Sequence, residues 1–175
     1  MLQQYCTAFK RAVVSNWQYK LGSRLLAGIV VGYLFLVLAI GLSWSIEPES
    51  TTIATTPEFT GTTITTTLLQ VASTLLDKPG GLLRNDIAPP GIWLDNMQNW
   101  EFGVLIQVRD LARALRKDFS RSQSQSTEDS DLATAEPQFN FDSTSWMLPS
   151  SEGEYLTGIK SLQSYLERLT QTASP

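Results

Sequence analysis

The sequence predicts a mainly α protein: one N-terminal transmembrane helix, followed by a small helical extracytoplasmic domain with an ordered Pro/Gly loop. Three observations lead to this fold class. Residues 25–46 contain no charged side chain. Three later segments repeat apolar residues at the spacing of one helical face, and no stretch predicts a convincing sheet. The 175 residues leave room for one ordinary domain beside the anchor.

The apolar segment Leu25–Ile46 reads LLAGIVVGYLFLVLAIGLSWSI and is predicted to be a transmembrane helix. A hydrocarbon core of about 30 Å requires about 20 apolar residues of helix. Trp17, Tyr19 and Trp44 lie near the two ends, where amphipathic rings favour the headgroup region. A signal peptide has an apolar region of only about 7–15 residues. Because this run is longer and begins late, we expect an uncleaved anchor.

The charges on the two sides of the span predict its direction. Residues 1–24, the expected cytoplasmic arm, contain Lys10, Arg11, Lys20 and Arg24 and no acidic residue. The other nine basic residues and all 17 acidic residues follow the span. Because basic residues near a span stay on the cytoplasmic side, we expect the amino end inside and the domain outside; in a bacterial inner membrane, outside is the periplasm. Its net negative charge argues against nucleic acid as a partner.

Composition separates a linker from the domain beyond the span. Residues 47–66 are rich in threonine and lack apolar periodicity, which predicts a linker, and the helical periplasmic domain is expected over 67–175. A first helix is predicted over 67–77, and the Lys-Pro-Gly-Gly sequence that follows ends it because proline cannot continue a helix. Residues 82–99 combine Pro and Gly with many apolar side chains, so we expect an ordered loop packed over the core.

The clearest predicted helix runs from Trp100 to Phe119. Its apolar residues form one core-facing stripe: Val104, Leu105, Val108, Leu111, Ala112, Leu115 and Phe119. Beside it lies a basic stripe: Arg109, Arg113, Arg116 and Lys117. Two interpretations fit the basic stripe. It is either a site for anionic lipid headgroups or an acidic partner, or a solvated helix edge paired with the chain's own acids, which is the commoner case.

The C-terminal part ends in a second strongly patterned helix. Residues 120–136 are polar and acidic, which predicts a mobile loop, and the alternation over 138–142 predicts a short strand or an extended packing segment. The last helix is expected to begin with Ser151 and Glu154 as a capping box. It carries a seam with heptad-like spacing: Tyr155, Ile159, Leu162, Leu166 and Leu169. The seam is predicted to bind another helix, either within the chain or across to an envelope protein partner or a second copy.

The residue types exclude most familiar catalytic and metal sites. The chain has no histidine, the commonest general base and metal ligand. Its single cysteine cannot form an internal disulfide or a thiolate zinc cluster. Neither a Gly-x-Ser-x-Gly turn nor a phosphate-binding Gly-rich motif occurs. We therefore predict no catalytic residue, no metal and no cofactor, and expect an interaction or structural domain rather than an enzyme.

One polar and aromatic cluster supports an alternative function. Between Asp86 and Glu101, tryptophan rings occur among carboxylate and amide side chains. These side-chain types commonly line glycan-binding grooves. Two carboxylates are also the minimum for glycoside hydrolysis, so the alternative is an envelope glycan-binding protein or hydrolase. The interpretation that we favour is simpler: Asp and Asn cap turns and helix starts, and the Trp rings fill the core. The candidate glycan-binding residues are Trp93, Asp95, Asn96, Trp100 and Glu101.

Two long stretches, Leu75–Phe102 and Val108–Pro149, carry a family resemblance. They read LLDKPGGLLRNDIAPPGIWLDNMQNWEF and VRDLARALRKDFSRSQSQSTEDSDLATAEPQFNFDSTSWMLP, and they resemble domain-of-unknown-function family 2333. The resemblance covers the anchor and everything after Leu68, whereas the Thr-rich residues 50–66 fit the family poorly. It implies a proteobacterial inner-membrane protein with one amino-terminal span, and no assigned reaction or cofactor. Members that continue past Pro175 imply that this chain is either a fragment, incomplete at its carboxyl end, or a short version.

Overall fold

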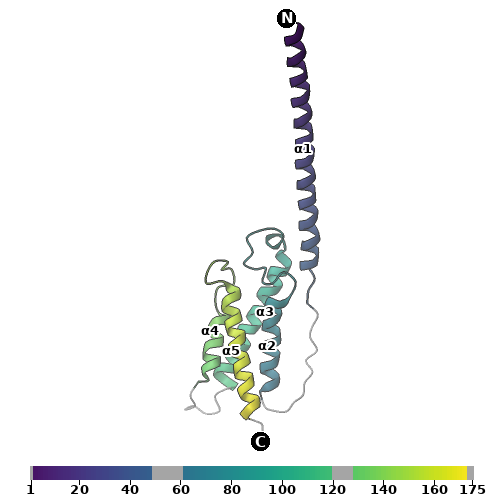
Figure 1. Ribbon diagram of the computed structural model, residues 1–175. Helices are drawn as coiled ribbons and strands as arrows, with labels where there is room; N and C mark the ends of the chain where they lie inside the picture. Colours follow the sequence, from purple (N-terminus) through teal and green to yellow (C-terminus); the bar gives the residue numbers. More distant parts are fainter. Residues whose placement is uncertain (1, 49–60, 120–127, 173–175) are drawn as a thin grey trace. The chain divides into compact units, whose positions relative to one another are not determined.

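The computed structural model describes residues 2–48, 61–119 and 128–172 (Figure 1). These ranges contain five α-helices and no strand, which confirms the mainly α fold class. The chain divides into two compact units, one up to Ile40 and one from Gly41 onward. The helices are α1 (Leu2–Trp44), α2 (Thr62–Asp77), α3 (Asp95–Ala114), α4 (Ser130–Phe139) and α5 (Ser151–Thr172), with a 3₁₀-helix η1 (Gly91–Trp93) before α3 and a π-helical segment η2 (Leu115–Phe119) after it.

Helix α1 is apolar and exposed over its second half. Gly22–Trp44 is long and apolar enough to cross a membrane, with a mean hydropathy of 2.7 over its most apolar 18 residues. Most of its large side chains are exposed: Leu25 is 63% exposed and Phe35 is 75% exposed, whereas Val37 is 4% exposed. In water, this much apolar surface would favour burial. The helix is compatible with a single membrane anchor or with a signal sequence.

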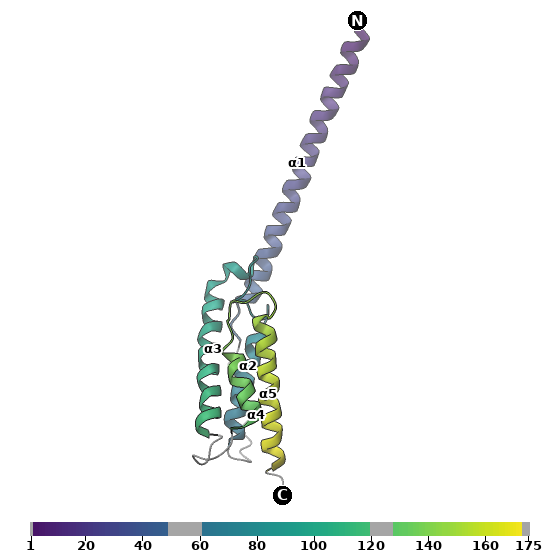
Figure 2. The same ribbon diagram turned by 90° about the vertical axis from the view of Figure 1, so that its left-hand side faces the viewer.

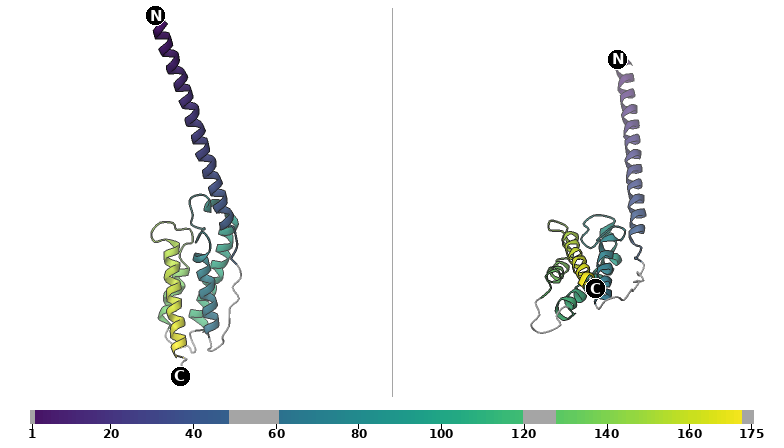
Figure 3. Two further views of the ribbon diagram at one scale, coloured as in Figure 1. Left: turned by 45° about the vertical axis from the view of Figure 1, so that its right-hand side comes forward. Right: turned by 60° about the horizontal axis from the view of Figure 1, so that its bottom comes forward.

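The second unit is a bundle of four helices that alternate in direction. Figures 1 and 2 show α2, α3, α4 and α5 side by side, each running opposite to the helix before it. Because α2 and α4 each pack against both α3 and α5, the four helices enclose one core. Two connections, residues 78–94 and 140–150, lie together at one end of the bundle, which we call the loop end. Figure 3 (right) brings forward the opposite end, where α5 finishes.

The core-facing stripe predicted on α3 lies in the interior of this bundle. Leu105, Val108 and Leu115 are each 1% exposed. Ala112 is buried beside them at 2% exposed. Val104 and Leu111 pack against the core from its edge, while the Phe119 side chain lies outside the described side chains. The helix begins at Asp95 rather than at Trp100, so the predicted loop is shorter than expected.

The seam predicted on α5 packs within the chain. Tyr155 and Leu162 are 1% and 0% exposed, Ile159 is buried beside them, and Leu166 and Leu169 are half-buried. Their helix packs on α4 and α2. Burial raises the pKa of the Tyr155 phenol to about 12, so the hydroxyl stays protonated at neutral pH. It donates a hydrogen bond to the Phe141 carbonyl at 3.2 Å.

The capping box predicted for α5 is wrong. Ser151 is already the first helical residue, and its hydroxyl donates backwards to the carbonyls of Asp142 and Ser145 at 2.7 and 3.0 Å. The side chain of Ser150 instead accepts from the Gly153 N–H at 3.3 Å. The helix start is therefore tied to the preceding loop, which a pattern within the helix cannot reveal.

Helix α4 was not anticipated from the sequence. It occupies part of the predicted mobile loop 120–136, of which residues 120–127 lie outside the described ranges, and part of the segment 138–142 that was predicted to be extended. The Asp129 carboxylate caps its start by accepting from the N–H groups of Asp131 and Leu132. The helix is short and offers few apolar residues, so its periodicity is weak. Its buried apolar residues are Leu132, Ala135 and Phe139.

Helix α2 begins at Thr62, inside the segment predicted as a linker, of which residues 49–60 lie outside the described ranges. Threonine has a low intrinsic helix propensity, which is why the helix was predicted to start later. Thr65 is fully buried, and its hydroxyl donates to the Gly61 carbonyl at 2.9 Å. Burial and this backbone hydrogen bond outweigh the propensity.

Candidate binding surface at the loop end

Polar contacts join the two connections at the loop end into one surface. The Arg84 guanidinium donates through Nε to the Ser143 hydroxyl at 2.9 Å. The Asn85 amide donates through Nδ2 to the Ser145 carbonyl at 3.0 Å and to Glu152 Oε2 at 2.9 Å. Asn85 is only 6% exposed. Because these donors are largely withdrawn from water, the two loops hold a defined arrangement.

A buried ion pair fixes the path of the first loop. Lys78 Nζ lies 2.5 Å from Glu101 Oε1, and the side chains are 1% and 0% exposed. The Glu101 carboxylate also accepts from the backbone N–H groups of Leu83 and Arg84 at 2.9 and 2.8 Å, and Lys78 also donates to the Gly81 carbonyl. Glu101 therefore anchors the loop from inside.

A hollow opens on the surface between the two loops. Its walls include Asn85, Asp86, the Ile87–Pro89 segment, Trp146 and Glu152. Burial raises the pKa of the Asp86 carboxyl, the negative charges of Glu101 and Glu152 raise it further, and Lys78 opposes them. The hollow thus combines a carboxyl with a raised pKa, a second carboxylate, an amide and an indole ring. In the described ranges, no group of three or more acidic or cysteine side chains is arranged to hold a metal ion.

Because the pKa of Asp86 is raised, we expect Asp86→Asn to increase the thermal stability of the domain by an amount that depends on pH. A carboxyl with a raised folded-state pKa contributes stability below its unfolded value of 3.8, and this contribution is lost as pH rises through the folded pKa. The Asp86→Asn variant should therefore melt at a higher temperature than the natural chain at pH 7, and the difference should shrink as pH falls toward 3.8. Thermal melts across pH check this, and a gain that is constant with pH would contradict the assignment.

Large apolar side chains stand exposed on both loops. Trp146 and Met147 are 56% and 62% exposed, and Leu148 is 95% exposed. These three residues are not among the site residues predicted from the sequence, although a Trp-Met-Leu-Pro run between polar residues was a readable signal. The loop-end patch, as we name this surface, consists of Ile87, Ile92, Trp93, Trp146, Met147 and Leu148.

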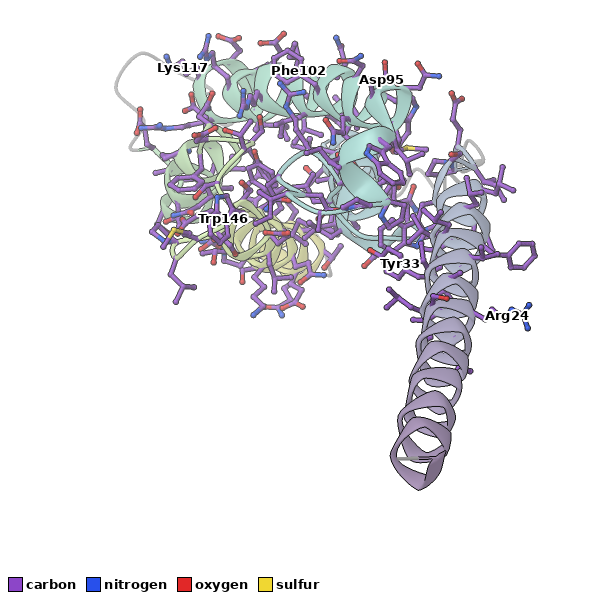
Figure 4. The ribbon with its side chains drawn as sticks, turned by 90° about the horizontal axis from the view of Figure 1, so that it is seen from above. Arg24, Tyr33, Asp95, Phe102, Lys117 and Trp146 are labelled. Atoms are coloured by element: carbon purple, nitrogen blue, oxygen red, sulfur yellow. The ribbon has the colours of Figure 1, made fainter. Side chains whose placement is uncertain are left out.

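The predicted glycan-binding residues face different environments. Trp93 is 57% exposed, and Asp95 and Asn96 are exposed beside it; all three line one pocket. Trp100 packs against the core and Glu101 is buried. The helix that begins at Asp95 causes this split, because successive residues turn by about 100° around its axis. Figure 4 labels Asp95 at the start of α3 and Trp146 on the other loop.

Comparison with known proteins gives the family. A family model described as an uncharacterized protein conserved in bacteria (DUF2333) matches residues 17–175. The chain belongs to the DUF2333 family. The match includes the apolar part of α1 and all four helices of the bundle, and it confirms the resemblance drawn from the sequence. No curated protein and no solved structure matches the chain.

In this DUF2333 bundle, three members of the basic stripe, which runs along α3 and η2, contact acceptors from the same chain. These contacts tie α3 to α4 and to the segments that flank α4, which favours the interpretation as a paired helix edge. Figure 4 shows Lys117, the last member of the stripe, toward the opposite end of the helix from Asp95. The pairs are Arg109 with the carbonyls of Phe139 and Phe141, Arg113 with Glu136, and Arg116 with Glu128 and Glu136.

Proposed function

We propose that this DUF2333 protein is a single-pass inner-membrane protein with a cytoplasmic amino end and a periplasmic helical domain. The observation that carries the proposal is the exposed apolar segment Gly22–Trp44. Basic residues without acidic ones precede it, and all the acidic residues follow it. In this proposal, residues 1–24 are the cytoplasmic arm, 47–66 include the linker, and 67–175 form most of the outer domain.

The proposed role of the outer domain is that of a non-enzymatic interaction or structural module of the cell envelope. Two features support it. The polar contacts at the loop end and the Lys78–Glu101 pair are used to hold the loops, and the loop-end patch presents apolar surface that a folded domain normally covers. Surfaces of this kind, built on braced loops, are typical of contact sites.

A second candidate function is suggested by the hollow. Glycoside hydrolysis needs two carboxyl groups, one of which is protonated at working pH. Asp86, with its raised pKa, fits the acid, Glu152 offers the second carboxylate, and Trp146 offers a ring against which a sugar can stack. Glu152 is already used to hold the first loop, since its Oε2 accepts a hydrogen bond from Asn85 Nδ2 at 2.9 Å. We therefore rank glycan binding or hydrolysis second.

Incubation of the detergent-solubilised full chain with peptidoglycan fragments separates the two functions. The interaction module should release no new reducing ends. Turnover that is lost in Asp86→Asn but retained in Asp110→Asn, a matched change at an exposed acid of α3, would establish the hydrolase and overturn our proposal. Glu101→Gln is not a clean test, because it also breaks the buried pair with Lys78.

A further inference from the structure

The loop-end patch gathers most of the exposed apolar surface of the bundle at one end. Each of its six side chains is at least half exposed. In the described part of the bundle, the other large apolar side chains with comparable exposure are Ile106 at 38% and Leu156 at 44%. Both are less exposed than any member of the patch. The apolar surface is therefore concentrated on the tips of two loops.

The patch is held in place by the core beneath it. The buried Lys78–Glu101 pair orders the first loop, and the Arg84–Ser143 and Asn85–Ser145 hydrogen bonds fasten it to the second. The two loops therefore present apolar side chains from a fixed base.

We propose that the loop-end patch docks on the surface of the lipid bilayer that holds α1. Tryptophan favours the boundary between headgroups and acyl chains, and apolar side chains on a peripheral element enter this boundary to a depth of about 5–10 Å. Trp93 and Trp146 take the headgroup level, and Met147 and Leu148 reach deeper. The inference rests on the proposed function in one respect, since it requires α1 to be a membrane anchor.

The length of the tether allows this contact. α2 has 16 residues and is about 24 Å long, and it begins at the end of the bundle opposite the loops (Figures 1 and 2). The chain between Trp44 and Thr62 has roughly 17 residues and spans up to about 60 Å when extended. It can therefore reach the far end of a bundle whose loop end rests on the bilayer. Tethering also makes the contact intramolecular, so modest intrinsic affinity is sufficient.

Charges around the patch define the kind of membrane surface it suits. Asp86, Asp95 and Glu152 lie on or beside the loops. The basic residues of the same loops are engaged elsewhere: Lys78 is buried against Glu101, and Arg84 lies 4.1 Å from the ring centre of Phe102. Docking is thus apolar, and it favours zwitterionic over anionic headgroups. Added salt should not release it, unlike an electrostatic contact.

The test uses the full chain in phosphatidylcholine nanodiscs that contain nitroxide-labelled lipid. Cys6 is the only cysteine, so Cys6→Ser provides a background for single labels. A polarity-sensitive fluorophore is attached through Leu34→Cys in the span, Leu148→Cys in the patch, or Thr170→Cys near the exposed end of α5. We expect the lipid nitroxides to quench the labels at 34 and 148, and to leave the label at 170 bright. Replacing half of the phosphatidylcholine with phosphatidylglycerol should weaken the quenching at 148.

The three positions separate the ways in which the inference can fail. If the label at 34 is quenched and the label at 148 is as bright and water-exposed as that at 170, the anchor stands and bilayer docking is wrong. If the label at 34 is also unquenched, the anchor itself is wrong, and the inference falls with it. A label at 148 that is shielded from water but not quenched by lipid would show a protein cover, such as a second copy, and would also overturn the inference.

Discussion

Replacing Leu162 by aspartate is expected to unfold the helical bundle. Leu162 is fully buried in the α5 seam among residues of α2 and α4. The change removes apolar packing, which alone costs about 2–5 kcal/mol in a Leu→Ala substitution, and adds an unpaired charge to the core. Because a domain of this size is stable by about 5–15 kcal/mol, little or no folded bundle should remain.

The neighbouring position provides the control for this prediction. Gln163 is exposed on the same turn of α5, so Gln163→Asp introduces the same charge without touching the core. Circular dichroism melts of the detergent-solubilised chain should show a cooperative transition for the natural chain and for Gln163→Asp. The transition should be lost in Leu162→Asp. If Leu162→Asp kept the natural melting temperature, the seam would not be part of the core as described.

Replacing Lys78 by methionine is expected to destabilise the bundle by about 3–5 kcal/mol, the usual cost of removing one partner from a buried ion pair. Methionine retains most of the volume of the lysine stem, so packing changes little. The Glu101 carboxylate keeps its two backbone donors but loses the ammonium that compensates its charge. The first loop should loosen together with the fold, since both depend on this carboxylate.

Urea unfolding curves measure this cost, with Lys160→Met as the matched control at an exposed site of α5. The control should lie within about 0.5 kcal/mol of the natural chain. Adding Glu101→Gln to Lys78→Met removes the uncompensated charge and should recover part of the loss. A Lys78→Met variant as stable as its control would mean that the pair does not hold the loop.

The spacing of apolar residues was sufficient to predict the long helices α3 and α5 but not the short helix α4. The stripes of α3 and α5 were readable because many apolar residues repeat on one face, and the core they form agrees with the prediction. The sequence did not predict α4, because this helix has only three buried apolar residues and these lie among acidic neighbours. Its place is decided by partners far along the chain, such as Arg116, which pairs with Glu136 at 2.6 Å. Such tertiary contacts leave no local signal in the sequence.

The sequence indicated only one of the two loops that form the candidate surface, because contacts between distant segments leave no local pattern. The composition of the loop that contains Asp86 and Trp93 indicated a possible site. The other residues of the surface, Trp146 and Glu152, lie much later in the chain. Only the fold brings the two loops together. Glu101 was a candidate glycan-binding residue, and nothing in the neighbouring sequence indicated that it would be buried in an ion pair with Lys78.

The most direct test of the account is the membrane topology of the full chain in bacterial cells. Alkaline phosphatase is active only outside the cytoplasm, and green fluorescent protein fluoresces when fused to a cytoplasmic end. A fusion after Pro175 should give phosphatase activity in the membrane fraction and no fluorescence, while a fusion after Leu21, before the apolar segment Gly22–Trp44, should give the reverse. A fluorescent, phosphatase-negative fusion after Pro175 would place the bundle in the cytoplasm and contradict the account. Phosphatase activity released into the soluble periplasm would show a cleaved signal sequence in place of an anchor.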